Sequence, residues 1–393
     1  MRILKIIPQA FYTTRGTPLS AYHRAKELVA RGHEVDILTY AIGADPPDLP
    51  GVRIFRSRGP HFARDLPPGP SRLKIWFDLL LFINLLGRLS RQRYDLLYAH
   101  EEGAFLARIA GWIFRVPYVY DMHSSLPLQI TDWKFSASRR VIDLFSWVER
   151  VSVRGACAVV AISPAVERAA KLAAANVRSV IIVNHFEMAE TDANDRGAVI
   201  RQRHGISADQ KVVLYAGSFV ELQALDLLID AVPLVLSRVE NVTFLLVGGS
   251  EPEIVKLRQQ AERLGVANHV IFELSRPQSE MPMYLAAADA VVSPRVQGIN
   301  PPGKLFSYLA SGRPVVATNT LVHNQLLDDR CAILTAPNAA GIADGLVTAL
   351  TDPARVAEVV KEAELFLRRY CSKPARDAAY GGLFAAVADA KRA

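Results

Sequence analysis

Cysteine is scarce in this 393-residue sequence, and its positions indicate no chemistry. Cys157, Cys331 and Cys371 are odd in number and far apart, so they predict neither a disulfide framework nor a metal site. The opening residues MRILKIIPQAF lack the apolar stretch and the small-residue cleavage site of a secretion signal, and they predict a first strand instead. These absences favour the reducing cytosol as the compartment.

Several motifs of well-known chemistries are also absent. The sequence has no G-x-x-x-x-G-K-[ST] loop, no G-x-G-x-x-G after the first strand and no G-x-S-x-G elbow. It has no Asp-x-Asp pair to hold a metal-bound diphosphate and no His/Cys cluster for zinc. The second half lacks interleaved basic and aromatic residues. We therefore expect no metal, no cofactor and no nucleic-acid partner.

The composition is that of a folded chain with an uneven charge. Half of the residues are hydrophobic and 22% are charged, which is enough apolar material for two domains. Residues 1–188 hold 25 Lys+Arg against 16 Asp+Glu, whereas the remainder holds 21 against 23. The basic first half indicates an anionic partner, such as nucleic acid, anionic lipid or a phosphorylated substrate, or else a solvated basic surface.

Apolar, β-branched runs alternate with helical patterns along the whole chain. Runs such as RILKIIPQ, YDLLYAH, KVVLYAGS and VTFLLVGG are continuous rather than alternating, which is typical of parallel strands covered on both faces. The fold class is therefore α/β, with two Rossmann-like domains that have parallel sheets and face each other across a cleft. The predicted divisions are an acceptor domain, a linker, a donor domain and a C-terminal helix that returns to the first domain, over residues 1–188, 189–205, 206–372 and 373–393.

Ligands of open parallel sheets bind beyond the carboxyl ends of the strands. This rule selects a short set of residues, because few polar or glycine residues follow the predicted strands directly. The set is Gly16, Thr17, His100, Glu101, Glu102, His123, Ser218, Phe219, Gly248, Gly249, Arg276 and Arg295–Gly303.

The stretch VQGINPPGKLFSYLASGRPVVAT, from Val296 to Thr318, predicts a loop, a helix over about 303–311 and a strand. Lys304 lies in the first turn of that helix, where a cation is unfavourable without a negative partner. A bound phosphate would remove this conflict, because the free N–H groups of a helix N-terminus also favour an anion. A lysine that points into water is the alternative.

The segment GKLFSYLASGRPVVAT resembles the donor-binding segment of the retaining glycosyltransferases of family four, which have the GT-B fold. KVVLYAGSFVELQALDLLIDAVPLV resembles the segment that opens their second domain, and MPMYLAAADAVVSPR the run before the donor segment. In the first half, RGTPLSAYHRAKELVARGHEVDILT, VYDMHSSLP and VERVSVRGACAVVAIS are similar to the same family. The resemblance covers most of the chain in the right order.

The resemblance implies a donor site with several departures from the usual pattern. The two glutamates that the family places around the donor loop fall on Ile299 and Ser307. The arginine and lysine that usually neutralise the diphosphate fall on Ser218 and Gln223. Charge-assisted hydrogen bonds to phosphate are about twice as strong as neutral ones, so Lys304, with Arg276 or Arg295, would carry the charge in their place.

In the first half, His123 matches the histidine that the family places near the donor sugar, and Glu149 matches a common family glutamate. An isolated loop histidine and a helical salt bridge are the respective alternatives. Gly16 permits close backbone approach by a ligand, although a plain turn explains it equally well. His100 with Glu101 is an acid/base candidate that surface charge also explains.

The very apolar segment Arg72–Arg93 is too short to span a bilayer. It predicts a helix that is buried over most of its face. The alternative is an interfacial helix whose basic flanks meet anionic headgroups, which would suit an enzyme with a lipid-linked acceptor.

The sequence thus predicts a retaining, metal-independent glycosyltransferase. It would move a sugar from a nucleotide-diphospho-sugar to a saccharide or lipid-linked acceptor in envelope or exopolysaccharide synthesis, in the cytoplasm or at the inner face of the membrane. His123 and Lys304 are the predicted catalytic residues, and Gly16, Thr17, His100 and Glu101 the predicted acceptor residues. The predicted donor residues are Gly217, Ser218, Gln223, Gly248, Arg276, Arg295, Asn300, Gly303, Leu305 and Ser307.

Two alternatives remain. One is a catalytically silent homologue that serves as a binding subunit, which the missing Arg, Lys and Glu positions favour. The other is a nucleotide-sugar epimerase, which would need acid/base groups that the loop from Val296 to Ser307 does not contain.

Overall fold

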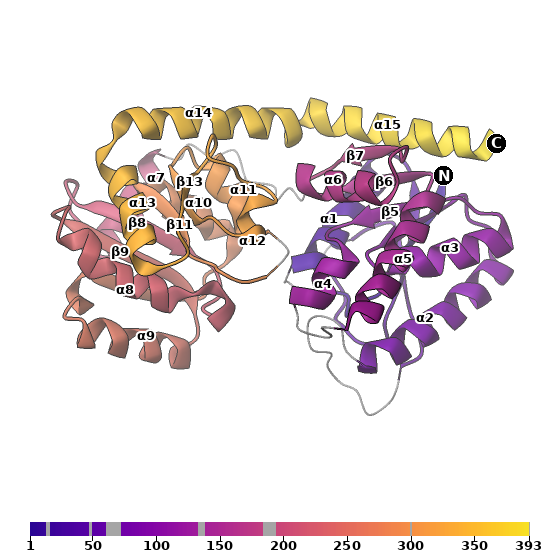
Figure 1. Cartoon of the computed structure of the whole chain (residues 1–393), viewed down its shortest axis with the longest axis horizontal. Coiled ribbons are helices and arrows are strands. Elements are labelled where there is room, and N and C mark those ends of the chain that lie inside the picture. Colours follow the sequence, from indigo (N-terminus) through magenta and orange to yellow (C-terminus); the bar gives the residue numbers. More distant parts are fainter. Residues whose placement is uncertain are drawn as a thin grey trace. The chain divides into compact units, whose positions relative to one another are not determined.

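The chain forms two compact units, each a parallel sheet with helices on both faces (Figure 1). The first unit combines Met1–His185 with Tyr370–Ala393, and the second is Phe186–Arg369. The prediction of an α/β fold with two Rossmann-like domains is confirmed. The computed structural model describes residues 1–12, 16–46, 49–59, 72–132, 138–183, 194–298 and 301–392.

The first unit contains a seven-stranded parallel sheet in the order β3-β2-β1-β4-β5-β6-β7. Its strands are Arg2–Ile7 (β1), Glu34–Thr39 (β2), Val52–Arg56 (β3), Leu96–His100 (β4), Tyr118–Met122 (β5), Ala158–Ala161 (β6) and Ser179–Ile181 (β7). Its helices are Gly16–Ala30 (α1), Arg72–Arg91 (α2), Gly103–Phe114 (α3), Leu126–Asp132 (α4), Arg139–Gly155 (α5), Pro164–Ala173 (α6) and Lys373–Arg392 (α15).

Two hydrophobic clusters cover the two faces of this sheet. On one face, α2, α3, α5 and α6 pack on the strands, and on the other α1 and α15 do so. Every residue of β4, β5 and β6 is buried, which explains why these strands are continuous apolar runs. The sequence analysis did not predict β3, whose VRIFR sequence lies at the sheet edge and is partly exposed.

The second unit contains a six-stranded parallel sheet in the order β10-β9-β8-β11-β12-β13. Its strands are Lys211–Ala216 (β8), Val242–Gly249 (β9), Val270–Leu274 (β10), Ala290–Ser293 (β11), Val315–Thr318 (β12) and Ile333–Thr335 (β13). Its α-helices are Asn194–Arg203 (α7), Leu225–Leu236 (α8), Glu251–Arg263 (α9), Met281–Ala287 (α10), Lys304–Ala310 (α11), Leu321–Asn324 (α12), Ala339–Thr351 (α13) and Pro353–Tyr370 (α14). Short 3-10 turns occupy Glu221–Gln223 (η1), Ala267–His269 (η2) and Gln278–Glu280 (η3).

Helix α7 lies where the sequence predicts a linker. Its Ile200 is fully buried, and its Arg201 donates to the carbonyl of Ala287 at 3.1 Å and to the carboxylate of Asp289 at 2.8 Å. Polar residues here therefore attach a helix to α10 rather than connect two domains, which composition alone does not reveal. The part of the predicted linker before residue 194 lies outside the described residues.

Helix α15 completes the core of the first unit. Its Tyr380, Leu383 and Val387 are buried in the hydrophobic cluster that α1 forms on the sheet. The helix also carries ion pairs to that unit, from Asp377 to Arg31 at 2.6 Å and from Asp389 to Arg178 at 2.6 Å. The C-terminal segment is thus an integral part of the first unit.

Truncation of Leu383 tests this role. We expect Leu383→Ala to destabilise the first unit by about 2–5 kcal/mol, because it leaves a cavity in a closed core. All four tryptophans lie within residues 1–185, so tryptophan fluorescence during urea unfolding reports on this unit. Leu365→Ala, at an exposed position of α14, is the matched control, and equal effects of the two variants would contradict the prediction.

Candidate functional site

The strongest candidate site lies in the second unit, at the carboxyl ends of β8 and β9. Gly217 follows β8 with φ +151°, and Gly248 near the end of β9 has φ +121°. A Cβ atom on Gly248 would lie 2.3 Å from the carbonyl oxygen of Gly217, so the two backbones approach as closely as only glycine permits. The backbone of these two glycines is therefore free of side chains, next to Lys304, which the sequence predicts as a catalytic residue.

Lys304 is the first residue of α11, and its side chain does not point into water. Its ammonium nitrogen lies 3.6 Å from the centre of the Tyr215 ring and donates to Gln223 Oε1 at 3.2 Å. Among the described residues no carboxylate forms an ion pair with it. Burial, and secondarily the charge of Arg295, hold the pKa of Lys304 well below its usual value. A partly buried cation is therefore held by an aromatic face and an amide, with no negative partner in the described part of the chain.

Arg295 follows β11 and belongs to a second, connected group. Its guanidinium donates to the carbonyl of Gln297 at 2.7 Å, and a Cβ atom on Gly298 would collide with it. The hydroxyl of Thr318 donates to the Arg295 carbonyl at 2.5 Å, which ties the loop to β12. Arg295 and Lys304 interact electrostatically, so the carboxyl end of β11 concentrates positive charge.

A buried histidine that the sequence analysis missed supports this loop. His323 Nδ1 lies 2.9 Å from the carbonyl of Thr318, and its Nε2 lies 2.9 Å from the hydroxyl of Ser293. Burial, together with the charges of Lys304 and Arg295, lowers the pKa of His323 to about 4. The ring is therefore neutral, donates through Nδ1 and accepts through Nε2. Its signal in the sequence was only a lone histidine in a short helix.

The other predicted donor residues differ in their placement. Ser218 is exposed and its carbonyl accepts from the Tyr215 hydroxyl at 2.7 Å, while Ser307 is partly buried on α11. Leu305 is fully buried and contributes to packing. Gly303 caps a helix of only seven residues, shorter than predicted. Asn300 and Ile299 lie outside the described residues.

Arg276 is engaged elsewhere. Its guanidinium pairs with Glu273 at 3.1 Å, a carboxylate that also contacts His204 at 3.1 Å. Arg276 thus stands at the carboxyl end of the edge strand β10, where Leu274 pairs with Gly249, and its place in a donor site stays a prediction.

In the first unit the predicted residues gather at the carboxyl ends of β4 and β5. His100 and His123 lie with ring centres 4.2 Å apart and both are buried. Between them lies Asp121, whose carboxylate is 3.3 Å from His100 Nδ1 and 3.5 Å from His123 Nε2. The sequence analysis placed both histidines at this edge but did not identify Asp121.

Glu101 is buried beside this cluster in an unusual conformation. Its φ of 48° lies in the left-handed region, which non-glycine residues rarely adopt. Its carboxylate accepts from Ser124 at 3.3 Å and from Gln129 at 3.4 Å. Burial and the neighbouring Glu102 raise the pKa of Glu101 well above its usual value. A protonated carboxyl group here is able to donate as well as accept.

Three other predictions for the first unit have plain outcomes. Gly16 and Thr17 begin α1, and residues 13–15 before them lie outside the described residues. Glu149 is buried on α5, where its carboxylate accepts from the N–H of Leu126 at 2.7 Å and from the hydroxyl of Ser125 at 3.2 Å. It thus holds the start of α4.

His100, Asp121 and His123 are close enough together to ligate a metal ion, but their surroundings disfavour one. The ammonium of Lys5 lies 3.4 Å and the guanidinium of Arg24 3.8 Å from the Asp121 carboxylate. One carboxylate already faces two cations, so a divalent ion would add charge of the wrong sign.

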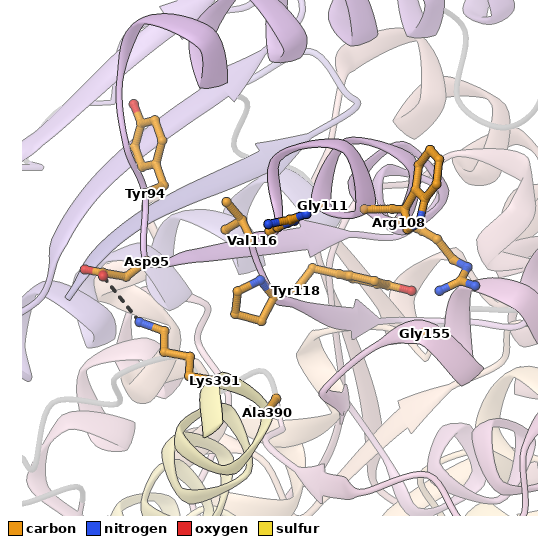
Figure 2. A pocket seen from close by; sticks show the side chains of 12 residues that line it. Tyr94, Asp95, Arg108, Gly111, Val116, Tyr118, Gly155, Ala390 and Lys391 are labelled. Atoms are coloured by element: carbon orange, nitrogen blue, oxygen red, sulfur yellow. Dashed lines mark hydrogen bonds and ion pairs between the residues drawn. The ribbon is translucent and has the colours of Figure 1, made fainter. Parts of the chain in front are cut away.

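A pocket of about 580 Å³ lies at the opposite edge of the same sheet (Figure 2). Residues that precede β4 and β5 line it, with parts of α3, α5 and α15. Of its basic residues, Arg115 and Lys391 stand where α3 and α15 end, and cations there stabilise the helix dipoles, whereas Arg108 lies within α3. Because ligands of parallel sheets bind at the carboxyl ends of the strands, we do not assign the reaction to this pocket.

Family models match both units. The Glycosyl transferase 4-like domain matches residues 15–185, and Glycosyl transferases group 1 matches residues 210–352. The chain belongs to the group 1 glycosyltransferases. The second match contains Gly217, Gly248 and Lys304, and the first contains His100 and His123.

Among its relatives, this glycosyltransferase is 27% identical over 377 residues to the phosphatidyl-myo-inositol mannosyltransferase of Mycobacterium leprae, covering 94% of this chain and 93% of the relative. It is 36% identical over 129 residues to a GDP-mannose-dependent α-(1-6)-phosphatidylinositol monomannoside mannosyltransferase of Mycolicibacterium smegmatis, covering 31% and 33%.

Solved structures share the fold. Anabaena Alr3699/HepE in complex with UDP has a TM-score of 0.71 at 22% identity, covering 98% of this chain and all of that one. Sucrose-phosphate synthase from Thermosynechococcus elongatus has a TM-score of 0.70 at 20% identity, covering 99% of each chain.

The buried His100 should make the stability of the first unit depend on pH. Burial and the neighbouring His123 lower the pKa of His100 to about 3, whereas in an unfolded chain histidine titrates near about 6.5. Below about pH 6.5 the unfolded chain binds a proton that the folded unit does not, so stability is lost as the pH falls. Between pH 6.5 and 5 this costs about 2 kcal/mol.

The measurement is urea unfolding followed by tryptophan fluorescence at a series of pH values. We expect the wild-type stability to fall more steeply than that of His100→Gln over this range. Parallel pH curves for the two proteins would contradict the prediction.

Proposed function

We propose that the chain is a retaining, metal-independent hexosyltransferase. It takes a sugar from a nucleotide-diphospho-sugar bound by the second unit and passes it to a saccharide or lipid-linked acceptor bound by the first. Envelope or exopolysaccharide synthesis is the setting that best fits this chemistry. The mycobacterial relative is named for transfer of mannose to phosphatidyl-myo-inositol, which supports a lipid-linked acceptor.

The observation that carries the proposal is that no carboxylate of the described residues pairs with the ammonium of Lys304. A partly buried cation without a carboxylate is costly, and a diphosphate would supply the missing charge. The bare backbone at Gly217 and Gly248 permits the close approach that a nucleotide needs. Since α11 has only seven residues, Lys304 rather than the helix dipole provides most of the stabilisation of the leaving diphosphate.

His123 is the proposed contact of the first unit with the transferred sugar. It stands directly after β5 and its ring is buried on nearly all sides, so its position is rigid. Burial lowers its pKa, and the neutral imidazole thus has one donor and one acceptor nitrogen for neighbouring groups.

A catalytically silent binding subunit is the second candidate. The positions where the family has arginine and lysine hold Ser218, which is exposed, and Gln223, which is a neutral partner of Lys304. The two candidates differ in one result, because a silent homologue would bind the nucleotide sugar without releasing nucleotide to an acceptor.

Replacement of Lys304 tests the donor site. We expect Lys304→Met to weaken nucleotide-diphosphate binding about 10- to 100-fold, since a hydrogen bond to a charged group contributes about 1.5–3 kcal/mol. Calorimetric titration with UDP, GDP and ADP and their sugars measures the effect and identifies the base. Lys211→Met, at the other end of β8, is the matched control and should leave binding unchanged. Wild-type affinity in Lys304→Met would refute the assignment.

We further propose that the helix layer of the first unit contacts an anionic membrane surface. α2 exposes Ile75, Trp76, Leu79 and Ile83, against the expectation that most of its face is buried. α3 exposes Trp112 at 82%, and α5 exposes Leu144 and Trp147. α2 and α5 both pack against α3, so these side chains belong to one helix layer. Such an array of large apolar side chains is uncommon on a monomer.

The charges of this layer fit anionic lipid in part as the sequence suggested. Lys74 and Arg88, in the flanks of α2, are paired with Glu102 and Asp36. Exposed basic residues stand at the C-terminal end of α2, at Arg91 and Arg93, and on α5, at Arg139, Arg140 and Arg150. Among the described residues no helix is both long and apolar enough to cross a bilayer, and the proposed contact is peripheral.

Vesicle co-sedimentation tests this surface. We expect the full chain to bind phosphatidylcholine vesicles only when they contain phosphatidylglycerol, and less so at high salt. The double variant Trp76→Ala with Trp147→Ala should lose binding, while Leu365→Ala on α14 should retain it. Equal binding to vesicles with and without phosphatidylglycerol would exclude the proposed membrane contact, and so would binding by the double variant.

A further inference from the structure

Asp121 stands at the centre of a buried polar cluster whose role the family match does not assign. It is the fourth residue of β5, fully buried in a strand that is otherwise apolar. His100 from β4 and His123 from the loop after β5 flank its carboxylate on either side, and their rings meet at 65°. A lone carboxylate at this depth is costly unless every neighbour supports it.

Two cations hold this carboxylate in its charged form. Lys5 from β1 lies 3.4 Å from one oxygen, and Arg24 from α1 lies 3.8 Å from the other. Burial alone would raise the pKa of Asp121, but the charges of Arg24 and Lys5 outweigh it and hold the pKa well below its usual value. Arg24 is itself fixed, since it donates to the carbonyl of Ile182 at 2.9 Å. The carboxylate is therefore a charged acceptor in a fixed place.

The contact with His123 is the one that is functionally informative. Asp121 Oδ1 and His123 Nε2 face each other at 3.5 Å, and within the described part of the chain neither atom has another hydrogen-bond partner. Buried polar atoms are normally paired, and a small movement brings these two within hydrogen-bond distance. His100 packs edge-on against the His123 ring and restricts its rotation.

We infer that Asp121 is a positioning residue that fixes the orientation and tautomer of His123. An ionised Asp121 accepts only, so His123 carries its proton on Nε2 and presents Nδ1 as the acceptor nitrogen. A sugar hydroxyl that meets this ring then donates to Nδ1. Lys5 and Arg24 keep Asp121 ionised, and His100 limits the ring to one rotamer. The effect on sugar transfer rests on the proposed function, whereas the orientation of the ring does not.

Histidine ring NMR tests the inference without any substrate. In the ¹⁵N-histidine-labelled full chain, with His123→Gln to assign the signal, we expect a neutral His123 protonated on Nε2 around neutral pH. Asp121→Asn should shift the ring toward a mixture of tautomers, because an amide both donates and accepts. A proton on Nδ1 of His123 in the wild type would overturn the inference. This measurement needs no variant, so the inference stays testable even if Asp121→Asn does not fold.

Asp36→Asn is the matched control. Asp36 is an equally buried carboxylate on β2 of the same sheet, and it accepts from Arg53 at 2.8 Å and from Tyr94 at 2.6 Å. Its loss removes comparable ion pairs at a position that contacts neither histidine. The His123 signal should be unchanged in this variant, and a change equal to that in Asp121→Asn would attribute the effect to general destabilisation and overturn the inference.

Kinetics adds a second readout. We expect Asp121→Asn to lower kcat about 10- to 100-fold, as loss of groups that orient an imidazole commonly does, with KM for the donor within about threefold of wild type. Asp121→Glu keeps the charge and should recover part of kcat. If the wild type transfers no sugar, the proposed function fails while the ring spectrum still decides the role of Asp121. An unchanged His123 spectrum in folded Asp121→Asn overturns the inference even if transfer occurs.

Discussion

A charged side chain inside a parallel sheet needs a neutralising partner close by, and both units illustrate this requirement. Strands covered on both faces leave water only at their ends, so polar side chains gather where the strands stop. Lys5 and Asp121 are exceptions, since both are fully buried within strands, and they neutralise each other across β1, β4 and β5. The two histidines at that edge lie on either side of the Asp121 carboxylate.

The two units solve the problem differently. In the first, the cations and the carboxylate are present together, so the cluster is complete within the protein. In the second, Lys304 has an aromatic ring and an amide for neighbours, and Arg295 adds repulsion rather than relief. That contrast is the basis on which we propose that the region around Lys304 binds an anion.

Sequence reasoning was strongest where one physical rule acts alone. Continuous apolar runs located the buried strands. The rule about carboxyl ends selected Ser218 and Gly248, and the unfavourable place of a cation in the first turn of a helix selected Lys304. It was weakest where tertiary contacts decide. β3 carries two arginines because it is an edge strand, and α7 is polar because Arg201 anchors it. The pairing of Arg276 with Glu273, three positions earlier, was likewise not foreseen.

The residues that hold the candidate site residues in place were only partly recognisable in the sequence. Asp121 and Lys5 were visible as charges inside apolar runs, and this was a usable signal of a buried pair. His323 and Ser293 gave no such signal, since their meaning depends on β11 and β12 being neighbours. Partners that come from different strands become apparent only when the strand order is known.

The path of the chain through the two units has a consequence for biosynthesis. One face of the first sheet is covered by α1 and by α15, and α15 is encoded after the whole of the second unit. During translation, part of the hydrophobic core of the first unit therefore stays exposed until residues 373–392 have left the ribosome. A chain interrupted within the second unit cannot finish the first, so only complete chains bury both cores.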